Sequence, residues 1–256
     1  MESILLLLGG LAAGTLNSIA GGAAIFLYPL MLSLGLKPVS ANATLSLVVW
    51  PGTISSAIGY RRAIKKIPSK FFFLLIPSFL GGEIGAVFLG HTSNNTFEYI
   101  VPWLLLLAAG LIGLHTKVHG LLNSKASQAF EGRHPLFLGS AAAITLFLLG
   151  IYGGYFGAGY GVMLLAFLSL TSFSDINQMN GFKNLSSISM NLMAITYFVS
   201  HHLVTWHVLP LLAIGDVIGG WLGANYGSRL PASYIRAIVV VAGVVVSLGL
   251  LIKTYA

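Results

Sequence analysis

The chain has 256 residues, of which 56% are hydrophobic and only 7% are charged. Soluble domains carry about 25% charged residues, so this composition excludes a water-soluble fold and indicates an integral membrane protein. The net charge is +7, but the basic residues lie beside apolar segments, as membrane orientation requires, which argues against nucleic-acid binding. The absence of cysteine excludes disulfides and Cys-ligated metals, and we expect no metal and no cofactor.

Ten apolar segments follow one another along the chain. They occupy residues 3–19, 22–36, 40–60, 70–90, 98–115, 135–156, 158–171, 178–200, 205–227 and 232–253. Most approach the ~20 residues that a membrane-spanning helix requires. The second and seventh are short, and each would cross the bilayer at a tilt or only in part. We therefore expect an all-α polytopic membrane protein with about ten membrane segments, or eight if neither short segment crosses.

A Gly-rich interruption occurs twice in this pattern. The sequences are GTLNSIAGGAAIFLYP at 14–29 and GGYFGAGYGVML at 153–164. Breaking a helix inside lipid frees backbone polar groups, which is tolerated only where they are buried in protein or line a cavity. Paired Gly-interrupted segments in two halves of a chain are typical of a transporter's binding site. The alternative interpretation is that the glycines only allow close helix packing.

The two halves of the chain resemble each other segment by segment. Residues 1–116 and 135–256 each hold five apolar segments, and a polar linker at 117–134 joins them. GGEIGA at 81–86 matches GGWLGA at 219–224, and the small-xxx-small spacing inside both motifs favours close helix contact. An odd number of crossings per repeat inverts the second copy relative to the first, as in many secondary transporters.

The distribution of basic residues favours this inversion. RRAIKKIPSK at 61–70 has five basic residues, whereas its counterpart HHLVTWH at 201–207 has no Lys or Arg. Basic residues favour the cytoplasmic side, so the equivalent loops should lie on opposite faces and both termini outside. Inside would lie Arg61, Arg62, Lys65, Lys66, Lys70, Lys117, Lys125, Arg133, Lys183 and Arg229, against Lys37 and Lys253 outside. With eight spans, the repeat would instead be parallel.

Long motifs in both halves resemble a known family. GTLNSIAGGAAIFLYPLMLSLGL with SANATLSLVVWPGTISSAIGYRRAI, and later MNGFKNLSSISMNLMAITYF with GDVIGGWLGANYG, are similar to the sulfite exporter TauE/SafE family, the 4-toluene sulfonate uptake permeases. The resemblance covers nearly the whole chain. It implies a transporter of small anions such as sulfite, sulfonates, sulfoacetate or carboxylates. One departure is that Ala23 follows Gly21 and Gly22 where the family often has a third glycine.

Polar residues near the two interruptions are the candidate anion ligands. Helix N-termini after the breaks present free N–H groups and the positive end of a dipole, and two of them could converge on one anion. Lys183 supplies a point charge suited to a compact anion, and Asn184, Ser187 and Asn191 follow on one helix face. The alternatives are that Lys183 is a cytoplasmic anchor and that the polar side chains, Ser187 above all, bond between helices.

The first half contributes a second polar group. Asn17, Gly21 and Gly22 lie at the first break, and Asn42 and Thr44 lie at the start of the third segment. Together with the second-half residues they form the predicted substrate site. Asn42 serves equally well as a helix cap.

Two acidic residues lie well inside predicted spans. Glu83 and Asp216 are candidates for binding a proton or cation coupled to transport. They are not equivalent in the repeat, because Glu83 aligns with Trp221. No catalytic motif is present, so we expect a secondary transporter in the cell inner membrane rather than an enzyme. An anion channel and an assembly factor without flux are the alternatives, and the oligomeric state, coupling ion and transport direction stay open.

Overall fold

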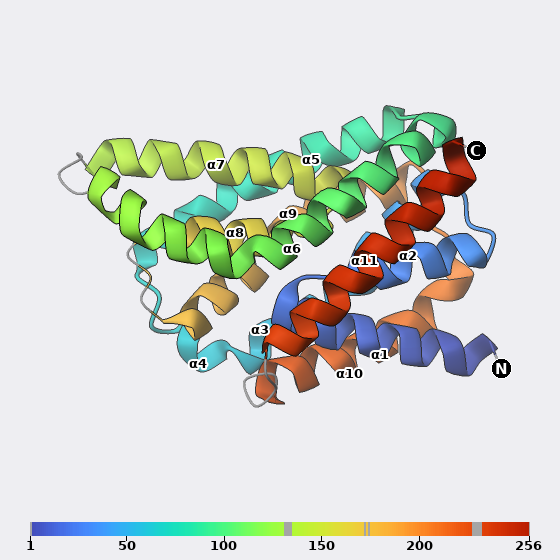
Figure 1. Ribbon diagram of the computed structural model, residues 1–256, viewed down its shortest axis with the longest axis horizontal. Helices are drawn as coiled ribbons and strands as arrows, with labels where there is room; N and C mark the ends of the chain where they lie inside the picture. The colour runs from blue at the N-terminus through green and yellow to red at the C-terminus, as the bar shows by residue number, and fades with distance from the viewer. Residues whose placement is uncertain (1, 131–134, 172, 174, 227–231, 256) are drawn as a thin grey trace.

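The computed structural model describes residues 2–130, 135–171, 173, 175–226 and 232–255. Regular structure in these ranges is helical throughout. The helices are α1 (Glu2–Ala20), α2 (Ala23–Ser33), α3 (Pro38–Gly59), α4 (Arg61–Ile64), η1 (Ser69–Leu74), α5 (Leu75–His91), α6 (Asn94–Phe130), α7 (Pro135–Tyr155), α8 (Tyr160–Leu168), α9 (Ile176–Ser200), η2 (Trp206–Val208), α10 (Leu209–Tyr226) and α11 (Ala232–Tyr255). Each of the ten predicted apolar segments therefore contains a helix (Figure 1).

Length and composition qualify four helical stretches of the described chain as membrane spans. They are Ser69–His91, Asn94–Leu114, Trp206–Tyr226 and Ala237–Tyr255. Shorter apolar helices cover Ser3–Ile19, Ala23–Ser33 and Gly139–Tyr155. The molecule is thus an all-helical polytopic membrane protein. The helix α6 is longer than its predicted segment, because it continues to Phe130 through most of the polar stretch that follows.

The helices pack in pairs that have the same pattern in both halves. α1 packs on α10 and α7 packs on α5, while α3 contacts α10 and α9 contacts α5. α2 contacts α11 in the same way that α8 contacts α6, and α6 packs against α11. Helices of the first half therefore lie between helices of the second. Both chain ends lie at one end of the molecule and α4 at the other (Figure 1).

Glycines let the main helix pairs approach backbone to backbone. A Cβ atom built on Gly81 would lie 2.3 Å from the carbonyl oxygen of Phe147 in α7. A Cβ atom on Gly219 would lie 2.1 Å from the carbonyl oxygen of Leu11 in α1. Real side chains do not come this close, so the predicted role of these motifs in close helix contact is confirmed.

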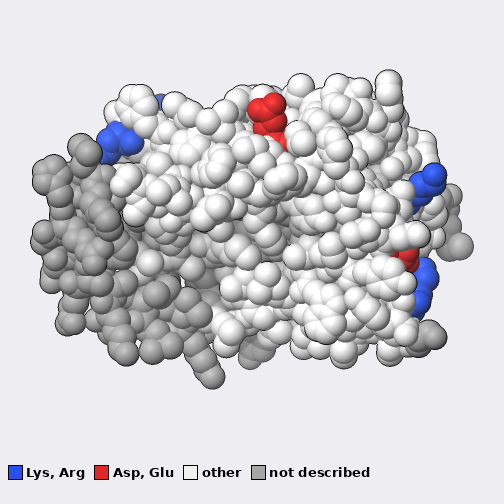
Figure 2. Space-filling view, turned by 90° about the horizontal axis from the view of Figure 1, so that it is seen from above, with Lys and Arg blue, Asp and Glu red and all other residues white. Residues whose placement is uncertain are grey.

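Charged side chains lie mostly at the two ends of the face in Figure 2, with one acidic side chain in the middle of an uncharged expanse. Exposed apolar residues such as Phe73, Trp103 and Ile252 cover the outside of the bundle, as lipid contact requires. Of the basic residues predicted to lie inside, Arg133 and Arg229 fall outside the described residues, as do the side chains of Lys117 and Lys125.

Candidate functional site

Both interrupted segments form broken helices. α1 ends at Ala20 and α2 begins at Ala23, with Gly21 between them at φ 74°. α7 ends at Tyr155 and α8 begins at Tyr160, with Gly157 and Gly159 at φ 77° and 75°. Glycine adopts this left-handed conformation without the steric penalty that other residues meet. The sequence-predicted interruption is therefore confirmed in each half.

The two breaks meet inside the molecule. A Cβ atom built on Gly21 would lie 3.5 Å from the Cα atom of Gly161, in the first turn of α8. The residue just before α2 and the first turn of α8 thus approach each other from different halves of the chain. The start of a helix carries the positive end of its dipole. Some of the leading N–H groups are already bonded locally, since Tyr160 donates to the carbonyl oxygen of Gly157 and Val162 to that of Gly159.

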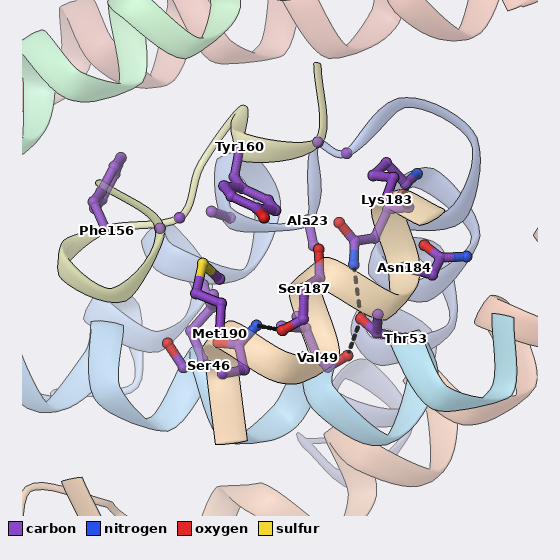
Figure 3. Close-up of a pocket in the computed structure, with 18 residues that line it drawn as sticks. Ala23, Ser46, Val49, Thr53, Phe156, Tyr160, Lys183, Asn184, Ser187 and Met190 are labelled. Atoms are coloured by element: carbon purple, nitrogen blue, oxygen red, sulfur yellow. Dashed lines mark hydrogen bonds between the residues drawn. The ribbon is translucent and has the colours of Figure 1, made fainter. Parts of the chain in front are cut away.

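A cavity lies between these helix starts, α3 and α9 (Figure 3). Its volume is about 50 Å³, which is room for roughly three to five waters. Its lining residues are Asn17, Gly21, Ala23, Ala24, Leu45, Ser46, Val49, Thr53, Gly153, Phe156, Gly157, Tyr160, Gly161, Lys183, Asn184, Ser187, Met190 and Asn191. This set includes a basic residue and several amides and hydroxyls, and no acidic residue is among them.

Lys183 is a buried cation of this cavity, with 3% of its surface exposed. Its Nζ atom donates hydrogen bonds to the carbonyl oxygens of Asn17, at 3.3 Å, and Ser18, at 3.2 Å. These carbonyls belong to the last turn of α1, where the negative end of the helix dipole favours a cation. An ammonium group has three protons, so one remains for another acceptor. The interpretation of Lys183 as an exposed cytoplasmic anchor is therefore wrong.

Amide and hydroxyl groups around the cavity are tied to one another. Asn184 Nδ2 donates to Ser56 Oγ at 2.8 Å, and the hydroxyls of Ser56 and Ser18 lie 2.8 Å apart. Asn17 Nδ2 lies 3.5 Å from Thr53 Oγ1, which in turn donates to the carbonyl oxygen of Val49 at 2.8 Å (Figure 3). These bonds connect α1, α3 and α9, so the first-half and second-half parts of the site form one network.

Two further cavity residues lie on the same face of α9 as Lys183. Asn191 donates from Nδ2 to the carbonyl oxygen of Ser187 at 3.0 Å, and both residues line the cavity. The Ser187 hydroxyl is drawn toward the space between Lys183 and Met190 in Figure 3. The predicted helical face of α9 is thus the wall of the cavity.

Three predicted substrate-site residues, Gly22, Thr44 and Asn42, lie outside the cavity; Gly22 and Thr44 contact other helices. A Cβ atom on Gly22 would point at Val239 of α11, 2.7 Å away. Thr44 accepts a hydrogen bond from the Thr205 backbone N–H at 2.9 Å, and so joins α3 to the segment before η2. Neither residue faces the site.

Asn42 supports the second break instead of the cavity. Its Nδ2 atom donates to the carbonyl oxygen of Tyr155, the last residue of α7, at 2.9 Å. The alternative that Asn42 caps its own helix is wrong, because α3 begins at Pro38 and Asn42 lies in its second turn. Asn42 of α3 thus donates to a carbonyl at the end of α7, as Lys183 of α9 donates to carbonyls at the end of α1.

The two intramembrane acids have different surroundings. Glu83 is exposed on α5, on the same outer side as the exposed Leu80 and Phe88. Asp216 is buried in α10, with 1% of its surface exposed. Its Oδ2 atom lies against Gly52 of α3, only 1.8 Å from where a Cβ atom would be. Neither acid lines the cavity.

Sequence reasoning missed two polar residues of the site, Thr53 and Tyr160. Thr53 lines the cavity from α3 together with Ser46, which lies seven residues earlier and so on the same helix face. Tyr160 lines it from the start of α8, and its hydroxyl lies 2.7 Å from Ser186 Oγ and 3.2 Å from Ser78 Oγ. Small hydroxyl residues in an apolar helix were a usable signal, although such residues also bond between helices.

Comparison with known proteins agrees with this architecture. Residues 6–250 match the family model described as Sulfite exporter TauE/SafE. A probable membrane transporter protein of Haemophilus influenzae is 27% identical over 91% of this chain and 88% of its own length. The probable membrane transporter protein YfcA of Escherichia coli K12 is 28% identical over 95% and 87%, respectively. The probable membrane transporter protein YunE of Bacillus subtilis is 25% identical over 90% and 89%.

No solved structure gives a significant match. The family model spans almost the entire chain. The relatives, which match this chain over most of their own length, are named as probable membrane transporters. The family resemblance drawn from the sequence motifs is therefore confirmed: the chain belongs to the TauE/SafE sulfite exporter family of membrane transporters.

Proposed function

We propose that this protein is a secondary transporter that moves small sulfur-containing or carboxylate anions, of the sulfite, sulfonate and sulfoacetate class, by alternating access. The observation that carries this proposal is the meeting of two helix N-termini, those of α2 and α8, at a cavity that also holds the buried ammonium of Lys183. Helix N-termini and a lysine all favour negative charge, and among the described residues that line the cavity none is acidic.

The size of the cavity supports a compact substrate. A cavity of about 50 Å³ suits an anion with a few heavy atoms, such as sulfite or a small sulfonate, better than a nucleotide or a lipid. Donors come from side chains on α1, α3 and α9, together with the helix starts. Asn17, Thr53, Lys183, Asn184, Ser187 and Asn191 are the side chains that we assign to anion binding.

The helix pairing supports an inverted repeat as the basis of alternating access. The long helices α1, α3 and α5, the short helix α2 and the helix α6 each have a second-half counterpart that packs against the equivalent partner. Both termini lie at one end of the molecule, while the basic segment around α4 lies at the other (Figure 1). By the positive-inside rule the α4 end faces the cytoplasm, and we place the protein in the cell inner membrane.

A binding screen tests this function. The purified protein would be titrated with sulfite, thiosulfate, sulfoacetate, taurine and simple carboxylates, and each ligand that binds would be tested for flux in proteoliposomes. A transporter gives saturable counterflow, in which unlabelled anion inside drives the uptake of labelled anion. An anion channel instead conducts without counterflow. If none of these anions binds, the proposed function is refuted.

A further inference from the structure

We propose that Asp216 is the proton-carrying residue of this transporter: it is protonated in the conformation described here and releases its proton to water when α10 moves away from α3. This inference rests on the proposed transport function and adds the coupling ion to it. Four observations carry the proposal.

The first observation is the burial of an unpartnered carboxyl group. Asp216 is 1% exposed, and within the described part of the chain neither of its carboxyl oxygens makes a hydrogen bond of ordinary geometry; only the backbone of Gly52 lies close enough for a weak one to Oδ2. An ionised carboxylate without partners is too costly to bury, so such a group takes up a proton instead. The neutral acid needs no counter-ion, which suits an apolar contact between helices.

The second observation is that, in the described part of the chain, the helices that pack against α10 have no charged residue near Asp216 in their sequences. The only ionisable residue of α1 is Glu2, twelve residues before the Gly14 that contacts Asp216, and α3 has none. The short η2 helix has His207, nine residues before Asp216, and α10 itself has Tyr226, ten residues after it. At 1.5 Å per helical residue, the backbones of these residues lie about 13 Å or more along the helices from Asp216 or from Gly14. The cavity cation Lys183 bonds to the carbonyl oxygens of Asn17 and Ser18, about one turn after Gly14 on α1, rather than to Asp216.

The third observation comes from the internal repeat. Asp216 precedes Gly219 by three residues, as Ser78 precedes Gly81, so the two occupy equivalent positions. Ser78 is fully buried and satisfied: its hydroxyl lies 3.2 Å from the Tyr160 hydroxyl and 3.0 Å from Ser186 Oγ. A small hydroxyl therefore meets the packing needs of this position. The carboxyl of Asp216 is additional, and packing does not account for it.

The fourth observation is the position of Asp216 behind the anion cavity. Its Oδ2 atom lies against Gly52, and the next residue, Thr53, lines the cavity from the same helix. Its backbone oxygen lies against Gly14, one turn before the cavity residue Asn17 on α1. A displacement of α10 that admits water to Asp216 therefore acts on the two first-half helices that hold the anion.

The proton step needs no further reactant. When the transporter is open to one side of the membrane, the carboxylate of Asp216 is exposed and takes up a proton from water on that side. Closure buries the neutral acid, and the opposite opening returns the proton to water on the other side. The outward or inward direction of net anion movement then follows the proton gradient.

Asp216→Asn is the main test, because the amide has the shape of the protonated acid but cannot release a proton and become charged. The full-length protein is reconstituted in liposomes and assayed with radiolabelled sulfite, sulfoacetate and each other anion that binds the wild type. We expect Asp216→Asn to retain counterflow within about threefold but to lose accumulation driven by a pH gradient. Asp216→Ser, which copies Ser78, provides a second variant with the same expected result. Glu83→Gln is the matched control and retains gradient-driven uptake.

A measurement without anion tests the protonation directly. The infrared difference spectrum between wild type and Asp216→Asn at neutral pH should contain the carbonyl stretch of a protonated carboxyl group. Gradient-driven uptake by Asp216→Asn overturns the proposal while the transport function stands. So does an infrared difference spectrum that contains the bands of an ionised carboxylate instead of a protonated carboxyl group. If the wild type exchanges none of the anions, the proposed function fails, and the coupling role fails with it.

Discussion

Replacing Lys183 by Met tests the assignment of the anion site most directly, because Met keeps the length of the side chain and removes its charge. An anion about 4 Å from the ammonium gains about 4 kcal/mol at an effective dielectric constant of 20. Part of this gain offsets the dehydration of the anion. Since each 1.36 kcal/mol is a factor of ten, we expect the dissociation constant to rise by about 100- to 1000-fold in a titration of the purified protein.

The effect of Lys183→Met on stability should be much smaller. The mutation removes two hydrogen bonds to the end of α1, at 3.2 and 3.3 Å, each contributing about 1.5 kcal/mol, the lower end of the range for bonds to a charged group, because both contacts are long. It also removes a buried charge, and that gain opposes the loss. We expect thermal unfolding to change by only a few degrees, so that folded protein is available for titration.

Two matched variants complete this test. Lys183→Arg keeps the charge and should retain measurable binding. Lys66→Met removes the same charge from an exposed position after α4, and its affinity should match the wild type within about threefold. Binding by Lys183→Met within threefold of the wild type would refute the site, because the charge would then contribute nothing to anion recognition.

Three further results are expected. Gly161→Ala adds a methyl group to the cavity wall, 3.0 Å from the flexible side chain of Lys183. Anion affinity should therefore fall at least about tenfold while thermal stability stays nearly constant. Unchanged affinity would show that Gly161 is not part of the anion site. Gly52→Ala brings Cβ to 1.8 Å from Asp216 Oδ2 and 2.5 Å from the Asp216 backbone oxygen, and should destabilise the fold by about 1–3 kcal/mol or more. Gly110→Ala, which has nothing within 4 Å of the added Cβ, should be neutral or stabilising. Equal melting temperatures of the two variants would contradict the packing of α3 on α10. Lys66→Cys, in a chain without native cysteine, should react with a membrane-impermeant maleimide only in inside-out vesicles, and labelling of intact cells would reverse the proposed orientation.

The sequence predicted the helices and both breaks well, for identifiable physical reasons. Long apolar runs have few alternatives to helix in a membrane, so the ten segments and their order could be predicted. The glycines at residues 21, 157 and 159 marked the interruptions, because positive φ angles are inexpensive only for glycine. The face of α9 that holds Lys183, Asn184 and Asn191 followed from helical periodicity alone.

The contacts between distant segments could not be predicted in this way. Asn42 and Thr44 are as polar and as well placed in the sequence as Asn17, yet they bond to the end of α7 and to the Thr205 backbone. Which neighbour a polar side chain meets depends on how the helices cross, and periodicity carries no information about crossing. For the same reason, Glu83 and Asp216 looked alike in sequence, although one is exposed and the other buried.

The contact between Gly21 and Gly161 bears on how such a protein could arise. One wall of the cavity comes from each half, and α5 and α10 each pack on helices of the opposite half. A single five-segment chain would have neither a complete cavity nor a partner for its own α5-like helix. Under the proposed inverted repeat, an ancestral unduplicated protein would form this site only as a pair of copies inserted in opposite directions, and gene fusion would then remove the need for dual insertion.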